Sequence, residues 1–140
     1  LEMVVTEIKK IADKIKIFFI LHPPTRVSLK KNNLYENLEK NPRCILLPRQ
    51  GFFEFNNLLV KAEFLITDGG SNQEECFYLG TPCLLFRSET ERSEGIGGNV
   101  VISNFDPTII ESFLLNYNSY RRQPISAVFS PSRFIVDQLV

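Results

Sequence analysis

The chain has 140 residues, the usual size of one folded domain, and 44% of them are hydrophobic, which excludes a disordered chain. Sixteen Lys and Arg balance sixteen Asp and Glu, so the net charge is zero and no broad basic field is present to attract nucleic acid or an anionic membrane. We therefore expect any anion to be bound locally, by a few well-placed groups.

The cysteines and the apolar runs bear on the compartment. Cys44, Cys76 and Cys83 are odd in number, lie in or beside apolar runs and lack metal-binding spacing, so we interpret them as buried reduced thiols. That usage predicts a cytoplasmic protein. The longest apolar run, residues 17–21, is too short to span a bilayer. The chain begins at Leu1 rather than Met, which is typical of an excised fragment.

The first half of the chain alternates between helical and strand patterns. Apolar residues recur at helical spacing over residues 4–15, which predicts an amphipathic helix. Residues 17–21 are continuously apolar, as in a parallel strand buried on both faces, and His22-Pro23-Pro24 ends it. A helix is predicted over residues 28–40, with Lys30 and Lys31 on its solvated face.

The same alternation continues with a strand at 44–47, a helix at 51–63 and a strand at 64–67. A strand at 99–103 and a helix beginning at Asp106-Pro107, an N-cap acid followed by proline, are predicted further on. Ser130-Pro131 repeats this start before a terminal helix containing Phe134, Ile135 and Leu139, after an irregular stretch at 117–129.

A glycine turn stands at the centre of the chain. Asp68-Gly69-Gly70-Ser71 ends the 64–67 strand, and its glycine pair permits backbone angles closed to other residues and a close approach by a ligand. A helix is predicted over 72–79, with Glu74 and Glu75 complementing the dipole in its first turn and Gly80 as a left-handed C-cap. A strand at 83–86 completes a βαβ unit, whose free N–H groups at the helix start can hold a phosphate.

Together these elements predict an α/β fold, a Rossmann-like doubly wound parallel sheet of about five strands. Ligands bind beyond the carboxyl ends of the strands in such sheets. Four segments stand at those ends: His22, residues 49–55, residues 68–75 and the charged loop 87–94.

Each of these segments also has a purely structural interpretation. A single histidine after a strand, such as His22, is more often structural than functional. Phe55 lies on an apolar stripe and could belong to the core. Glu74 and Glu75 could serve only the helix dipole, and the 87–94 loop could be only a solvated surface.

A longer string of residues resembles a known family. The chain has Thr67-Asp68-Gly69-Gly70-Ser71-Asn72-Gln73-Glu74-Glu75, then Leu79-Gly80-Thr81-Pro82, then Arg87 with Thr90-Glu91-Arg92-Ser93-Glu94. This is similar to the C-terminal half of the UDP-N-acetylglucosamine 2-epimerases, which read roughly T-D-S-G-G-x-Q-E-E, L-G-x-P and R-x-x-T-E-R-P-E. The resemblance extends from His22-Pro23 to the last helix.

The resemblance implies one half of a two-domain GT-B-type architecture, as in UDP-glycosyltransferases and glycogen phosphorylase. Residues 1–140 would form a single UDP-binding domain, and the N-terminal domain would be absent. By position, Gly69, Gly70 and Ser71 correspond to the turn that holds the diphosphate. Glu75 corresponds to the acid that accepts hydrogen bonds from the ribose hydroxyls.

Three further positions follow from the same resemblance. Arg92 matches an arginine near the nucleotide, Phe55 and the segment before it match the part that lies against uracil and ribose, and His22 matches a histidine of the interdomain cleft. The chain departs from the family where Ser-Gly-Gly becomes Gly69-Gly70-Ser71 and where Ser93 replaces a proline. The hydroxyl thereby moves two positions.

The reaction implied is the interconversion of UDP-GlcNAc and UDP-ManNAc, by elimination of UDP and its re-addition, in cell-envelope polysaccharide biosynthesis. Its acid and base groups belong to the N-terminal domain and to an H-R-R-E-N motif before the equivalent of Leu1. We therefore predict no catalytic residue in this chain and no turnover by it alone. Enzymes of this family are often dimers, so the resemblance is compatible with a homodimer, and it implies neither a metal nor a cofactor.

Two other interpretations stay open at this point. The chain could be the donor-binding domain of a GT-B glycosyltransferase, which binds the same nucleotide in the same kind of cleft. It could also be a non-catalytic module that binds nucleotide sugars, as the altered glycine turn suggests.

Overall fold

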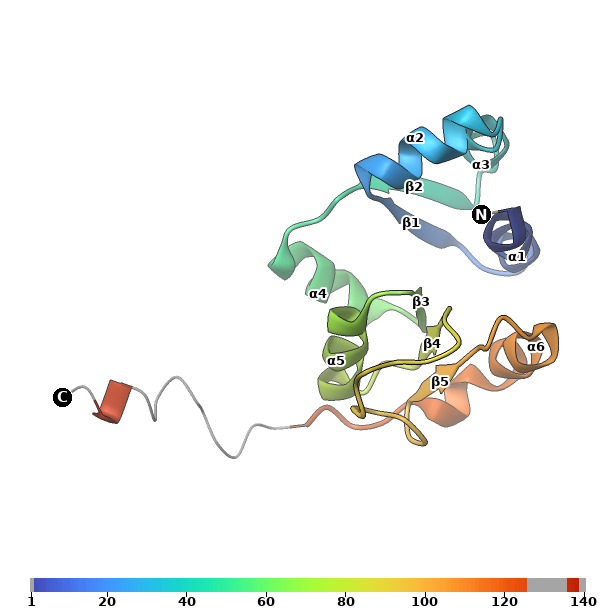
Figure 1. Ribbon diagram of the computed structural model, residues 1–140. Coiled ribbons are helices and arrows are strands. Elements are labelled where there is room, and N and C mark those ends of the chain that lie inside the picture. The colour runs from blue at the N-terminus through green and yellow to red at the C-terminus, as the bar shows by residue number, and fades with distance from the viewer. Residues whose placement is uncertain (1, 126–135, 139–140) are drawn as a thin grey trace. The chain divides into compact units, whose positions relative to one another are not determined.

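The computed structural model describes residues 2–125 and 136–138 (Figure 1). The chain divides into two compact units, Leu1–Glu54 and Phe55–Val140, which are described in turn. None of the helices in the described ranges is long and apolar enough to span a membrane. The terminal helix predicted after Ser130-Pro131 lies largely outside the described residues. Of this predicted helix only residues 136–138 are described, and they are helical.

The first unit is a two-stranded parallel sheet with three helices. Its elements are α1 (Glu2–Ala12), β1 (Ile17–Leu21), α2 (Pro23–Lys31), α3 (Tyr35–Glu39) and β2 (Cys44–Pro48). Strand β1 pairs with β2 so that Ile17 lies opposite Cys44 and Leu21 opposite Pro48. The apolar stripe of α1 packs against buried residues of β1, α2, α3 and β2. The members of this cluster include Val5 and Ile8 of α1 together with Leu21, Leu29, Leu38 and Cys44.

The structure corrects two expectations for this unit. The helix predicted over 28–40 is two short helices, α2 and α3, separated at Asn33, whose φ of 56° interrupts the helical path. Pro23 and Pro24 begin α2, because proline is well suited to a first helical turn. Strand β1 is also not buried on both faces, since Phe18 is 50% exposed.

The second unit is a three-stranded parallel sheet with helices on both faces. Helix α4 (Phe52–Lys61) leads into β3 (Leu65–Thr67), α5 (Gly70–Leu79), β4 (Cys83–Leu85), β5 (Val100–Ile102), α6 (Pro107–Asn116) and a short 3-10 helix (Tyr117–Tyr120). The strand order is β3-β4-β5, with Leu65, Cys83 and Val100 side by side.

Alternate residues of the central strand β4 pack against different helices. Cys83 and Leu85 belong to a cluster with Leu59 of α4 and Cys76 of α5. Leu84, between them, belongs to a second cluster with Ile110 and Phe113 of α6. Figure 1 shows α5 and α6 on opposite sides of this sheet. The predicted α/β fold with parallel strands is thus confirmed, but the expected single sheet of about five strands is wrong, because the strands form one sheet of two and one of three.

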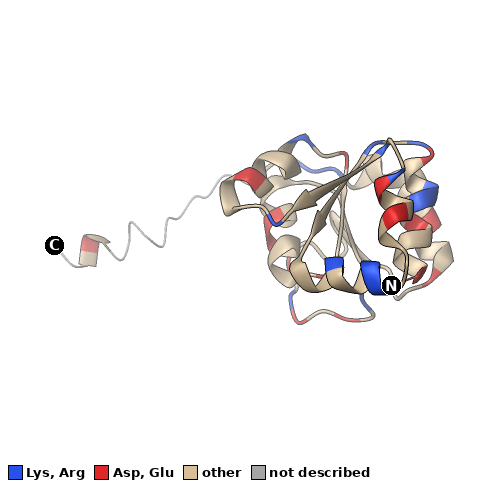
Figure 2. Ribbon diagram, turned by 90° about the horizontal axis from the view of Figure 1, so that it is seen from above, with Lys and Arg blue, Asp and Glu red and all other residues tan. Residues whose placement is uncertain are grey.

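The charges follow the same arrangement. Figure 2 shows Lys, Arg, Asp and Glu on the helices and connecting loops, whereas the five strands carry none. Uncharged strands are expected where helices cover the sheet. The three cysteines are free and buried, as predicted.

The predicted helix ends at Gly80 and Asp106 are confirmed. Gly80 follows α5 with φ of 70°, and the N–H of Thr81 donates to the carbonyl of Cys76 at 3.0 Å. The Asp106 carboxylate accepts from the N–H of Thr108 at 2.7 Å and so caps α6.

Candidate functional site

The start of α5 directly follows strand β3. The helix begins at Gly70, with Gly69 as an N-cap that supplies no side chain. The first N–H groups of a helix have no partner within it, so this end can accept an anion. Because α5 begins two residues earlier than predicted, Glu74 and Glu75 lie beyond its first turn, and the role predicted for them at the helix dipole is wrong.

The glycine pair is needed for space rather than for unusual backbone angles. Gly69 has an extended backbone with φ of −92°, Gly70 is helical, and neither has positive φ. A Cβ atom on Gly70 would stand 2.8 Å from Nε of Arg92 and 3.0 Å from Oε1 of Glu91. The expectation of special angles is therefore wrong, and the missing side chain makes room for the arginine.

Thr67 fixes the turn from the strand side. Its Oγ1 accepts hydrogen bonds from the N–H of Gly69 at 3.0 Å and from Nδ2 of Asn72 at 2.9 Å. Ser71, the residue whose hydroxyl is shifted relative to the family, is exposed on α5. The sequence pattern marked Thr67 and Asn72 only as part of a motif and gave no sign that they are bonded to each other.

Arg92 and Glu75 each carry a buried polar atom without a partner. Nη1 of Arg92 pairs with Oε2 of Glu74 at 2.5 Å, but the Nε of the same arginine has no hydrogen-bond partner. Oε2 of Glu75 is likewise buried and unpaired. Within the described residues these are the two buried side-chain atoms left unsatisfied. Unsatisfied buried groups are rare in folded proteins, and a bound ligand, ion or water would satisfy them.

The surroundings of Glu75 change its acidity. Burial raises the pKa of its carboxyl, and the neighbouring charge of Glu74 raises it further. A hydroxyl donor placed against Oε2 would satisfy the carboxylate and oppose this shift. The site thus offers one buried acceptor and one buried cationic donor.

Gln73 holds the loop that carries Arg92. Its side chain is fully buried, and its Nε2 donates to the carbonyls of Arg92 at 3.2 Å and of Glu94 at 2.8 Å. Its Oε1 accepts from Oγ1 of Thr90 at 2.8 Å. Sequence reasoning missed this role, because partners 17 to 21 residues apart leave no local spacing signal.

The rest of the loop fits the structural alternative of a solvated surface. Glu89 and Glu91 are exposed. Arg87 pairs with Glu91 at 3.3 Å, an exposed contact that contributes little stability. The pKa of Glu91 is lowered by a hydrogen bond from its own backbone and by the charge of Arg87.

Two predicted site residues lie elsewhere. Phe55 is half-buried and packs against the core cluster of Leu59 and Cys76. His22 belongs to the first unit, where it is exposed and stands as the N-cap of α2 without a side-chain capping bond. The structure thus places Arg92 against Gly70 and Glu74 of α5 and Glu75 on the same helix, while His22 belongs to the first unit.

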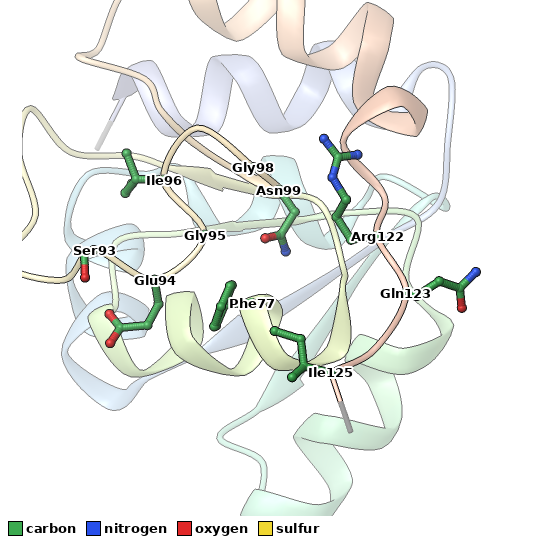
Figure 3. Close-up of a pocket in the computed structure, with 10 residues that line it drawn as sticks. All are labelled: Phe77, Ser93, Glu94, Gly95, Ile96, Gly98, Asn99, Arg122, Gln123 and Ile125. Carbon is green, nitrogen blue, oxygen red and sulfur yellow. The ribbon is translucent and has the colours of Figure 1, made fainter. Parts of the chain in front are cut away.

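A cavity of about 450 Å³ opens on another part of the second unit. Figure 3 shows Phe77 of α5, the 93–99 loop and the 122–125 segment around it. None of the predicted UDP-binding residues lines it. A second cavity, of about 510 Å³, borders Val60, Leu79 and residues 121–124. In the described ranges no group of three or more His, Cys, Asp or Glu side chains is placed to hold a metal ion.

The family model described as UDP-N-acetylglucosamine 2-epimerase matches residues 1–123. The chain belongs to the UDP-N-acetylglucosamine 2-epimerase family. An epimerase of that name from Methanocaldococcus jannaschii is 35% identical over 117 residues, which cover 82% of this chain and 32% of the relative. One from Methanococcus maripaludis is 36% identical over 110 residues, covering 76% and 30%. The chain thus spans about a third of the length of these epimerases.

Solved epimerase structures share the fold. The UDP-GlcNAc 2-epimerase of M. jannaschii superposes with a TM-score of 0.81 at 30% identity, covering 99% of this chain and 40% of that one. A complex of the same enzyme with UDP-GlcNAc and UDP gives 0.77, covering 99% and 39%. The Neisseria meningitidis epimerase bound to UDP-GlcNAc gives 0.75 at 27% identity, covering 99% and 40%. These epimerase structures therefore confirm the predicted family and its GT-B-like fold.

Proposed function

We propose that this chain is the UDP-binding part of an enzyme that interconverts UDP-GlcNAc and UDP-ManNAc. The observation that carries the proposal is the pair of unsatisfied buried atoms, Oε2 of Glu75 and Nε of Arg92, in the second unit around α5. A nucleotide offers hydroxyl donors for the first atom and phosphate acceptors for the second. Two epimerase structures with this fold contain UDP-GlcNAc, one of them together with UDP.

Each predicted residue has a role in this proposal. The backbone at Gly69, Gly70 and Ser71 receives the diphosphate at the start of α5, with Arg92 beside it. Glu75 accepts hydrogen bonds from the ribose hydroxyls. Phe55 lies against uracil and ribose. His22 is assigned from the family resemblance alone to the cleft that faces the N-terminal domain.

The proposed contribution to catalysis is electrostatic. When UDP leaves the sugar as an anion, negative charge grows on the phosphate oxygen of the bond that breaks. Backbone N–H groups at the helix start and the Arg92 guanidinium stabilise that charge more strongly in the transition state than in the ground state. This accounts for the leaving of UDP, not for proton transfer at the sugar.

Proton removal and return at the sugar need an acid and a base beside it. We assign those groups to an N-terminal domain that precedes this chain in the complete enzyme. This chain is then a single C-terminal domain. We place the complete enzyme in the cytoplasm, as a homodimer. The 140-residue chain alone is accordingly expected to show no epimerase activity. Turnover of UDP-GlcNAc by the purified chain would contradict this assignment.

The test is a calorimetric titration of the chain with UDP, with ADP as the control nucleotide. We expect selective UDP binding that Glu75→Ala and Arg92→Ala each weaken by about 1–3 kcal/mol, the range for hydrogen bonds to charged groups. Glu111→Ala, an exposed change on α6, is the matched control and should leave binding unchanged.

The outcomes separate the candidate functions. Equal binding of UDP and ADP would indicate a general phosphate site. The absence of binding would contradict the proposal for this chain, and the same titration on a longer protein that includes the preceding domain would show whether that domain completes the site. Glycosyl transfer to an acceptor by that longer protein would favour a GT-B glycosyltransferase, and UDP binding without epimerisation would favour a non-catalytic module.

A further inference from the structure

Gln73 ties down both sides of the Arg92 main chain. On one side, the N–H of Arg92 donates to Oγ1 of Thr90 at 3.3 Å, and that hydroxyl donates to Oε1 of Gln73. On the other side, Nε2 of Gln73 donates to the carbonyl of Arg92. We propose that Gln73 is a positioning residue, which holds Arg92 beside the start of α5 and thereby sets the affinity for the nucleotide diphosphate.

The fixed main chain limits where the Arg92 side chain can lie. The guanidinium passes over Gly70, where there is no Cβ to block it, and ends on Glu74 one turn further along α5. Both contacts lie on the helix that carries Gln73. A shift of the loop would therefore move the charge away from the N–H groups of the helix start, and the phosphate would lose a cationic donor.

The chemistry of a side-chain amide suits this position. Two donors on one nitrogen satisfy two loop carbonyls, and the oxygen accepts one hydroxyl. Methionine has a similar length but neither group, so it would leave both carbonyls unsatisfied. An ionised carboxylate has acceptors only and would face those carbonyls with like charge.

A second buried amide, bonded to the other end of α5, provides the matched control. Asn99 is 2% exposed, and its Nδ2 donates to the carbonyls of Cys76 and Thr81 at 2.8 Å each. Like Gln73 it links two carbonyls, but it does so where the helix ends. Asn99→Leu should therefore lower global stability without releasing the stretch 87–94.

The experiment compares Gln73→Met, Gln73→Glu and Asn99→Leu in the full 140-residue chain. The first measurement is backbone amide hydrogen exchange over 87–94, with the 107–116 helix as internal reference. The second is titration with UDP. For Gln73→Met we expect exchange to accelerate in 87–94 and not in α6, and the UDP dissociation constant to rise about tenfold.

Gln73→Glu adds a pH dependence that a merely structural role would not produce. The protonated carboxyl can still donate one hydrogen bond to the loop, whereas the ionised form cannot. The charged residues next to it are Glu74 and Glu75 on α5 and, through their main-chain carbonyls, Arg92 and Glu94 on the loop. Relative to the wild-type chain at each pH, we expect loop protection and UDP affinity to be retained near pH 5 and lost toward pH 8.

This inference rests on the proposed function, but the two can fail separately. Unchanged exchange over 87–94 in Gln73→Met, or the same acceleration in Asn99→Leu, would overturn the positioning role whatever UDP does. Released exchange in Gln73→Met with wild-type UDP affinity would overturn the link to the nucleotide. If the wild-type chain binds no UDP while the exchange results hold, the proposed function fails for this chain and the role of Gln73 in holding the loop stands.

Discussion

Two adjacent carboxylates on α5 meet different surroundings. Glu74 is partly exposed and is paired with Arg92. Glu75, one residue later, has a buried oxygen without a partner, and its pKa is raised by burial and by Glu74. A raised acid pKa means that the folded state disfavours the ionised form. The carboxylate that suits a ligand thus costs the unliganded protein stability.

This cost predicts a pH dependence for Glu75→Gln. Between the ordinary pKa of 4.5 and the raised value, the folded state binds more protons at this group than the unfolded state, so wild-type stability falls as pH rises. The glutamine variant lacks this loss. We expect its melting temperature to match the wild type near pH 4 and to exceed it at pH 7, in thermal melts without ligand. A constant difference at all pH values would contradict the assignment.

Gly70→Ala tests the space above the start of α5. The new Cβ would stand 2.8 Å from Nε of Arg92, so the arginine must move, while alanine itself is favourable in a helix. We expect a chain with near wild-type melting temperature and UDP binding weakened about tenfold, by calorimetry. Undiminished affinity would show that the position of Arg92 over Gly70 does not matter for binding.

At this scale the sequence predicted some of the residues around α5 but not the contacts between them. It singled out Gly70 and Arg92, which lie against each other, and Glu75, which lies on the same helix as Gly70. It did not predict that Arg92 would pair with Glu74 or that Gln73 would hold the loop. These contacts join residues about 20 positions apart, and they depend on the path of a loop that has no periodic pattern.

Helix α5 ends as firmly as it begins. Gly80 has φ of 70°, its carbonyl accepts from the N–H of Arg122 at 3.0 Å, and a Cβ there would overlap the Arg122 carbonyl oxygen. This glycine therefore allows both the left-handed C-cap and the close passage of the 121–125 segment.

Gly80→Ala is expected to lower the free energy of unfolding by about 2–4 kcal/mol, because left-handed strain adds to steric overlap. Gly97→Ala separates the two causes, since Gly97 has φ of 75° but a Cβ atom there would meet no other atom within 4 Å. That control should cost only about 1–2 kcal/mol in urea unfolding. Equal losses in the two variants would mean that the Arg122 contact contributes nothing.

The start of α6 offers a simpler prediction. Asp106→Ala removes the acceptor for the N–H of Thr108 and should cost about 1 kcal/mol in urea unfolding. Asp106→Asn keeps an acceptor oxygen and should cost much less. A larger loss in the asparagine variant would show that charge, rather than capping, is what stabilises this end.

Element boundaries were predictable where a strong local signal marks them. The pair Asp106-Pro107 gave the start of α6, and Gly80 gave the end of α5. The boundaries of α2 and α3 were not predictable, because Pro23-Pro24 is compatible with both the end of a strand and the start of a helix. The break at Asn33 depends on one left-handed residue that asparagine tolerates without requiring it.

Across the whole molecule, the apolar strand runs determined the fold class. Five uncharged runs, most of them separated by helices, predicted parallel strands. Successive side chains of β4 pack against helices on opposite faces of the sheet. The division of the five strands into one sheet of two and one sheet of three was not predictable from the apolar runs. Nothing in their composition distinguishes a neighbour within one sheet from a neighbour in the next.

The three thiols report on the two units separately. Cys44 belongs to the first unit and Cys76 and Cys83 to the second, and all three are buried. The pKa of Cys83 is raised by a hydrogen bond with Cys76 and by burial, and burial raises that of Cys44. Few thiolates are therefore present at Cys44 and Cys83 at pH 8 to attack a disulfide reagent.

In increasing urea we expect Cys44 to become reactive first, because a two-stranded sheet with a small core is the less stable arrangement. Labelling followed by peptide mass spectrometry assigns each thiol. Rapid labelling in native buffer would contradict the burial of the thiols, and simultaneous labelling of all three would mean that the units unfold together.

The bonds from Gln73 also bear on how this protein can vary. The two that its Nε2 donates end on main-chain carbonyls, which every amino acid provides, so this part of the loop is held without regard to the side chain at position 94. A library that randomises single positions should accept many residues at Glu89 and Glu94 and few at Gln73 or Gly70. The chemistry of the loop surface can then diverge between relatives while the path of its backbone is inherited unchanged.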